Sequence, residues 1–143
     1  MEYGWLVFAI LSAITAALVA LFGKMGLEGI DTNTATMVRA GIMFAFLIIV
    51  VFATGKTSEI SAIFSNSRAL YYIVLSGFAG ALSWLFYFMA LKMGRISQVV
   101  PIDRLSIVFA IILAFLVLGE KINIKIAVGA ALMAAGAILV AIG

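Results

Sequence analysis

Five stretches of the sequence are apolar over roughly the 20 residues that a helix needs to cross a bilayer. Hydrocarbon offers the backbone no hydrogen-bond partner, so each stretch must be helical to satisfy its own N–H and C=O groups. The sequence therefore predicts an all-α integral membrane protein. Its five transmembrane helices are expected over about residues 4–23, 34–54, 69–91, 97–118 and 124–142.

The composition requires a lipid environment. Of the 143 residues, 66% are apolar and 10% are charged, against about 45–50% and about 25% in a soluble domain. A soluble fold of this length could not bury so many apolar side chains, because small domains leave much of their surface exposed. We expect one multi-pass domain over residues 1–143, in the inner (cytoplasmic) membrane of a cell.

The sequence lacks residues that enzymes and metal sites commonly use. The sequence has no cysteine and no histidine, which removes thiol nucleophiles, Cys-ligated metals and the commonest general base. A net charge of +3 from scattered residues is not the footprint of a nucleic-acid-binding surface. We therefore expect no enzyme activity, no metal, no cofactor and no nucleic-acid partner.

The connections carry nearly balanced positive charge. Five spans place the two termini on opposite sides, with four Lys and Arg residues on the N-terminal side and five on the other. The positive-inside rule acts on this difference, so the sequence predicts insertion in both orientations. Leaving out Arg39 and Arg104, which lie inside spans, gives four against three and still only a weak bias.

Small side chains recur along three of the helices. Such stripes let helices approach closely in lipid, either within one chain or across a dimer. The stripes are Ala9, Ala13, Ala16, Ala20 and Gly23 in the first helix, Ser76, Gly77, Gly80, Ala81 and Ser83 in the third, and Ala127, Ala130, Ala134, Ala137 and Ala141 in the fifth.

Four charged residues lie about two turns inside helix ends, all on the side of the membrane that holds the C-terminus. They are Lys24, Arg39, Asp103 and Arg104. A charge at the centre of a span costs about 2.5–3.5 kcal/mol on insertion scales. One hypothesis is a charged gate or substrate vestibule, in which Asp103 pairs with one of the three cations. The alternative is snorkelling to lipid headgroups, together with ordinary salt bridges.

Three more residues are candidates for the substrate path. Trp84 and Tyr87 lie well inside the third span, where their polar atoms need a partner or a wet cavity. They line a pocket for an apolar or aromatic substrate, or they pack the bundle. Pro101, the only proline, frees the carbonyl four residues earlier. It predicts a hinge or broken helix beside the site, or a first-turn proline that only starts the helix.

The order of several short pieces resembles an EamA domain of the drug/metabolite transporter superfamily. The resemblance covers nearly the whole chain and is densest from Leu85 onward. Trp5, Lys24 and Arg39-Ala40 fit it further upstream. The pieces are the Ala-Leu-x-x-Gly end of the third helix at Ala90–Gly94, Ser-x-Val-x-Pro at Ser97–Pro101, Leu118-Gly119-Glu120, and Gly-Ala-x-Leu-x-x-x-Gly at Gly129–Gly136.

The resemblance implies a fold and a function. Most relatives hold two such domains in one chain, ten helices arranged as an inverted repeat, whereas this sequence has one. It implies a half-repeat that antiparallel homodimerisation completes to ten helices, which agrees with the balanced loop charges. It also implies a secondary transporter that moves a small-molecule substrate, an organic solute, across the lipid bilayer by alternating access. Two alternatives are an accessory subunit of a half-size hetero-pair and a flippase for a lipid or lipid-linked carrier.

The sequence departs from better-known relatives at two points. Many carry Glu-Pro in the middle of the fourth helix, where this chain has Ser106-Ile107. Small multidrug transporters carry a membrane-embedded glutamate in the first helix, where this chain offers Ser12 and Thr15. A proton-coupled cation exchanger built on that acid is therefore disfavoured.

Overall fold

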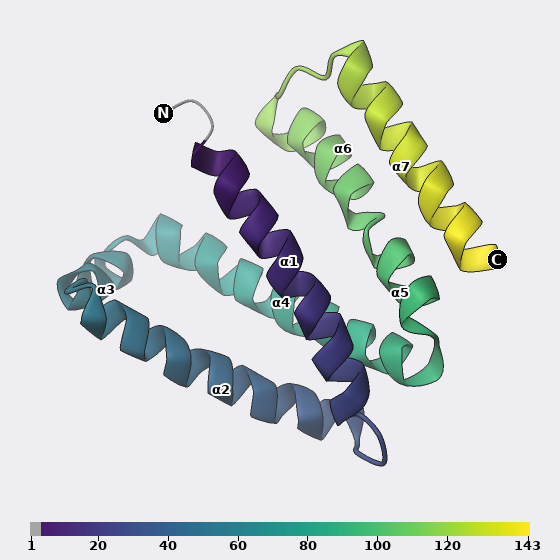
Figure 1. The fold of residues 1–143 in the computed structure, drawn as a ribbon. Helices are drawn as coiled ribbons and strands as arrows, with labels where there is room; N and C mark the ends of the chain where they lie inside the picture. The colour runs from purple at the N-terminus through teal and green to yellow at the C-terminus, as the bar shows by residue number, and fades with distance from the viewer. Residues whose placement is uncertain (1–3) are drawn as a thin grey trace. The chain divides into compact units, whose positions relative to one another are not determined.

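The computed structural model describes residues 4–143, and these form helices without strands. Residues 1–3 of the expected domain lie outside the described residues. The helices are α1 (Gly4–Gly26), α2 (Thr32–Ala53), α3 (Thr57–Ser65), α4 (Ser67–Met93), α5 (Ile96–Asp103), α6 (Ser106–Leu118) and α7 (Ile124–Ile142) (Figure 1).

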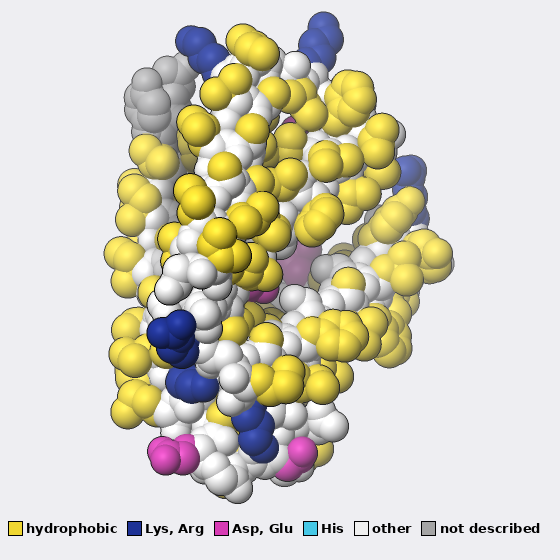
Figure 2. Space-filling view, turned by 90° about the vertical axis from the view of Figure 1, so that its right-hand side faces the viewer, with side chains coloured by type: hydrophobic (Ala, Val, Ile, Leu, Met, Phe, Trp, Pro, Cys, Tyr) yellow, Lys and Arg dark blue, Asp and Glu magenta, His cyan; other side chains and the backbone are white. Residues whose placement is uncertain are grey.

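The prediction of five spans is confirmed. α1, α2, α4, the pair α5–α6, and α7 are each long and apolar enough to cross a membrane. At most 11% of the residues in the most apolar window of any span are buried, so most of this apolar surface needs hydrocarbon around it. Figure 2 shows one face, on which hydrophobic side chains predominate.

Side-chain caps explain where several helices begin. The Asn66 Oδ1 accepts a hydrogen bond from the Ala69 backbone N–H at 3.0 Å, so α4 starts at Ser67 rather than at the predicted residue 69. Asn123 caps α7 in the same way through the Ile126 N–H. Each cap satisfies one of the backbone donors that the first turn leaves without a partner.

The helices form two compact units. The hairpin unit, residues 25–92, holds α2, α3 and α4 up to Lys92. The terminal unit, from residues 4–24 and 93–143, holds α1, α5, α6 and α7.

In the hairpin unit, α2 and α4 run antiparallel and α3 joins them (Figure 1). Thr32 and Thr36 are buried in the first two turns of α2, and Phe88 and Leu91 are buried near the end of α4. At the same end of the unit, the Lys92 Nζ donates a hydrogen bond to the Ile30 carbonyl at 2.8 Å. One hydrogen bond therefore links the end of α4 to the loop just before α2.

In the terminal unit, α7 packs against α5 and less extensively against α6. Ala130 and Ala137 of α7 are buried, and the Gln98 side-chain amide donates a hydrogen bond to the Ala141 carbonyl at 3.4 Å. Packing within the chain thus uses part of the small stripe predicted for this helix. Ala127 of the same stripe is exposed.

The fourth span, predicted as one helix over 97–118, is divided into α5 and α6. Across the break, the Leu105 N–H donates to the Ile102 carbonyl and the Ile107 N–H to the Arg104 carbonyl, at 3.0 and 3.1 Å. These bonds join residues three apart, the spacing of a tightened turn. Pro101 lies in the interior of α5 and not in its first turn, so the local geometry is that of a broken helix.

Gly119 ends α6 in the left-handed conformation, with a φ of 68°. The Gly119 and Glu120 N–H groups both donate to the Ala114 carbonyl, which closes the helix. A side chain at this φ would be strained. The left-handed backbone conformation therefore explains why the middle residue of Leu118-Gly119-Glu120 is glycine.

A pH-dependent cap is expected at Asp31. Its Oδ1 accepts hydrogen bonds from the backbone N–H and the hydroxyl of Thr34, both at 2.9 Å. These bonds, the backbone one foremost, lower the pKa of the Asp31 carboxyl below its ordinary value of 3.8. The folded state favours the ionised form, so the cap's contribution is present above that value and is lost as pH falls through the lower folded pKa.

We expect the melting temperature in detergent to fall more steeply below about pH 4 for the wild type than for Asp31→Asn, which caps without titrating. Thermal scans at stepped pH measure the difference. Parallel pH profiles of the two proteins would contradict the assignment.

Candidate functional site

Arg39 of α2 stacks on Trp84 of α4. The guanidinium carbon lies 3.4 Å from the centroid of the Trp84 ring and 5.4 Å from that of Phe88. Arg39 lies roughly 10 Å along the helix from Thr32 at the usual rise per residue. A cation over an aromatic face is attracted by the ring quadrupole, so the stack stabilises a charge where little water is available.

The aromatic platform is held by its own neighbours. Trp84 meets Tyr87 and Phe88 edge to face, with ring centroids 5.7 and 5.9 Å apart. Phe88 is buried, while Trp84 and Tyr87 are half-buried. Such edge-to-face pairs favour one arrangement of the rings, so the surface under Arg39 is well defined.

A groove of about 550 Å³ lies between α2 and α4, inside the hairpin unit. Its α2 wall runs from Asn33 to Leu47 and its α4 wall from Ser76 to Leu85. Arg39 and Trp84 both line it. The volume falls within the range of about 300–1,000 Å³ that is typical of small-molecule sites.

Small residues open the α4 wall. Ser76, Gly77, Gly80 and Ala81 line the groove, and a Cβ added at Gly77 or Gly80 would meet no described atom within 4 Å. The stripe was predicted to allow close helix packing. Within the hairpin unit it instead borders open space.

The predicted site residues divide between the two units. Arg39, Trp84 and Tyr87 come together in the hairpin unit, whereas Lys24, Pro101, Asp103 and Arg104 belong to the terminal unit.

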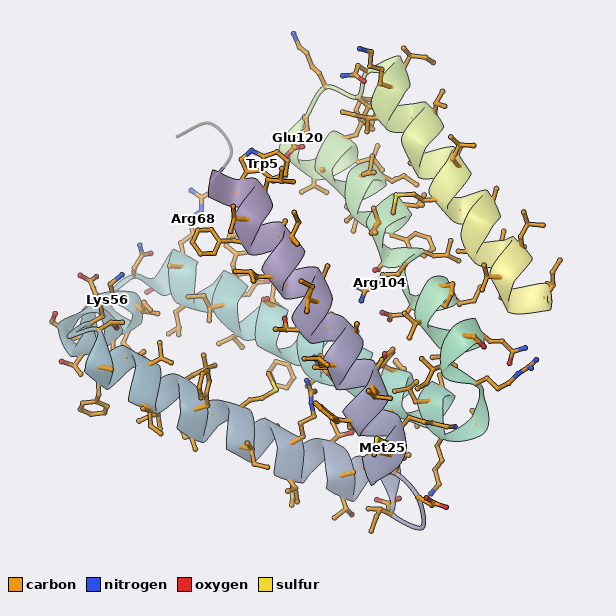
Figure 3. All side chains as sticks on the ribbon, in the orientation of Figure 1. Trp5, Met25, Lys56, Arg68, Arg104 and Glu120 are labelled. Carbon is orange, nitrogen blue, oxygen red and sulfur yellow. The ribbon has the colours of Figure 1, made fainter. Side chains whose placement is uncertain are left out.

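Within the terminal unit, the Lys24 Nζ donates a hydrogen bond to the Gly94 carbonyl at 2.8 Å, just beyond the end of α4. Asp103 and Arg104 stand at the break between α5 and α6, where Figure 3 labels Arg104. A pairing of Asp103 with Arg39 stays a prediction. Among residues 4–143, no three His, Cys, Asp or Glu side chains lie close enough to hold a metal ion.

Sequence reasoning missed the α2 wall of the groove. Its residues recur at helical spacing as Asn33, Thr36, Ala40, Met43 and Leu47. The signal was the pair of polar residues two turns or less from Arg39 on one face of an otherwise apolar helix. That face indicates a groove only when the α4 residues opposite it are known to have small side chains.

Two comparisons with known proteins give related results. The sequence model of the EamA-like transporter family matches residues 3–142. A protein of Sinorhizobium sp named "Uncharacterized transporter in cobO 3'region" is 42% identical over 142 residues, which cover 99% of this chain and 99% of that protein. That relative therefore also has the length of one five-span unit. No solved structure matches the chain.

We expect Arg39 and Trp84 to be energetically coupled. Arg39→Gln and Trp84→Leu should each lower the free energy of unfolding. The double variant should lose less than the sum by about 0.5–2 kcal/mol, because both changes remove the same cation–π contact. Reversible unfolding in mixed micelles measures the free energy of unfolding of the wild type, the two single variants and the double variant.

Arg68→Gln is the matched control, because Arg68 is an arginine of the same unit that does not line the groove. Its coupling to Trp84→Leu should be close to zero. A coupling for Arg39 no larger than that for Arg68 would show that the stack contributes nothing.

Proposed function

The chain belongs to the EamA-like transporter family, and from that premise we propose that it is a secondary transporter of small organic solutes. The groove between α2 and α4 carries this proposal, because it is a cavity of ligand size within two membrane spans. Its walls are mostly apolar and hold one cation, the composition typical of a small-molecule site. The Sinorhizobium relative is also named a transporter.

The solute crosses by alternating access. The fourth span supports this mechanism, because it is broken between Asp103 and Ser106 and carries a proline inside α5. Discontinuous helices beside the substrate path are a recurring element of secondary transporters. The charged side chains beside such a break can change partners as one side closes and the other opens. Asp103 and Arg104 stand at this break and act as gate residues.

The working unit is an antiparallel homodimer. An odd number of spans, with loop charges of four against five, permits both orientations. A second copy in the opposite orientation supplies the other five helices of an inverted repeat. Exposed small residues such as Ala13 and Ala127 offer faces for close helix contact. In such a dimer the four charged residues predicted to form a gate recur on the opposite side of the membrane, which gives two equivalent gates. They are Lys24, Arg39, Asp103 and Arg104.

Orientation can be measured directly because the sequence has no cysteine. Single cysteines at Asn66, between α3 and α4, and at Gly143, the last residue, lie on opposite sides of the five-span topology. Intact cells are labelled with a membrane-impermeant thiol reagent before and after permeabilisation. We expect each site to be labelled in part from outside, because both orientations are present.

Full labelling at one site and none at the other would contradict dual orientation. The chain would then pair with a differently oriented partner subunit or assemble in parallel. A cysteine within α2, at Ile48, is the control and should remain unlabelled in both states because it lies in a span.

A further inference from the structure

The charge in the groove has no counter-charge on the groove walls. Arg39 is the one charged residue among the described residues that line it. The carboxylates of the hairpin unit are Glu28, Asp31 and Glu59, and none of them is a wall residue. A charge with little water around it is costly unless it is paired. The groove is therefore complementary to one negative charge.

The stack on Trp84 does not itself use the hydrogen-bonding edge of Arg39. A distance of 3.4 Å between the guanidinium carbon and the Trp84 centroid requires the two planes to lie nearly flat on one another. The five N–H donors of a guanidinium point outward in its plane. Two of them match the two oxygens of a carboxylate. Trp84 therefore orients the cation without using its donors.

The groove has a polar and an apolar end. Asn33 and Thr36, together with Met37, lie between Arg39 and the start of α2, whereas Met43, Phe44 and Leu47 line the part beyond Arg39. On α4, the residues that line the groove before Trp84 have small side chains, and Ser76 is the polar one among them. An occupant with one charged end and an apolar body matches this gradient. A single arginine balances a monoanion, which favours a carboxylate over a doubly charged phosphate.

A helix from a second copy is the competing occupant. It would have to bring a carboxylate to Arg39, and Asp103 is the one acidic residue within the five spans. If the counter-charge came instead from the chain's own terminal unit, Asp103 would again be the one acidic residue within a span that could supply it. Asp103→Asn therefore separates a protein counter-charge from a bound anion.

We propose that the groove binds a small amphipathic organic anion, with its carboxylate on the edge of Arg39 and its apolar body between α2 and α4. This inference rests on the proposed function, for which it names the substrate class. Arg39 and Trp84 are then binding residues, and Gly77 and Gly80 provide the space for the body of the solute.

Trp84 can report on binding. The sequence has two tryptophans, Trp5 and Trp84, so Trp5→Phe leaves Trp84 as the single emitter. The full chain in phosphatidylcholine nanodiscs is titrated with phenylacetate, protonated phenethylamine and 2-phenylethanol, which share an apolar body and differ in charge. We expect a saturable change in emission with phenylacetate, and at least tenfold weaker binding of the other two.

Variants test the residues one at a time. Arg39→Gln should weaken phenylacetate binding at least tenfold, whereas Arg39→Lys should keep part of it. Gly80→Leu should also weaken it, because a side chain there extends into open space and fills the groove. Arg68→Gln is the matched control and should bind as the parent does. A cooperative melting transition well above the temperature of the titration would show that the weakened variants are folded, even where the transition is lower than in the parent.

Four outcomes would overturn the inference. Phenylacetate, phenethylamine and phenylethanol could bind alike, or Arg39→Gln could bind phenylacetate as tightly as the parent. Binding that appears only in Asp103→Asn would identify Asp103 as the partner of Arg39. A Trp84 signal that follows added phosphatidylglycerol, and no solute, would identify a lipid headgroup as the occupant.

Uptake into proteoliposomes distinguishes a failure here from a failure of the proposed function. If phenylacetate does not bind but a cationic or neutral solute is transported, the anion site is wrong and the transporter proposal stands. If phenylacetate binds through Arg39 but neither it nor another solute crosses the membrane, the anion site stands and the transporter proposal is wrong.

Discussion

Hydrocarbon provides no hydrogen-bond partners, and this constraint decides which backbone and which side chains the chain can place in the bilayer. Every span is helical, and the one interruption, at Arg104 and Leu105, closes its backbone bonds through a tightened turn. The same constraint makes charged groups conspicuous. The Lys92 ammonium group donates a hydrogen bond to a backbone carbonyl in the loop between α1 and α2, whereas the Arg39 guanidinium stacks on an aromatic face.

The Arg39–Trp84 stack joins two parts of the hairpin unit that differ in packing. Towards the start of α2, Thr32, Phe88 and Leu91 are buried, and Lys92 of α4 donates a hydrogen bond to the loop before α2. In the other direction, the small residues of α4 leave a groove. A buried end beside an open, mostly apolar space is a suitable arrangement for a binding site, because the buried end can hold the charge and the open part can receive a ligand.

Hydropathy alone predicted the five spans, because the transfer of apolar side chains into lipid depends on local composition. The sequence singled out Arg39 and the pair Trp84 and Tyr87 as unusual inside a span, but it did not predict that the arginine stacks on the tryptophan. The groove was not predictable, because it depends on how far α2 and α4 separate beyond Trp84. The same small residues, Gly77 and Gly80, suit close packing or an open wall, and only the position of the opposite helix distinguishes the two. The division of the fourth span was suggested by Pro101, but the break itself lies three residues later.

The most direct test of an antiparallel ten-helix unit uses two copies joined end to end. Five spans place the termini on opposite sides, so direct fusion forces the second copy to invert, whereas one extra spanning helix in the linker keeps the copies parallel. Native mass spectrometry from detergent gives the oligomeric state of each fusion. We expect the direct fusion to be a monomer and the helix-linked fusion to associate further through its unpaired faces. A monomeric helix-linked fusion together with an associating direct fusion would contradict the antiparallel arrangement.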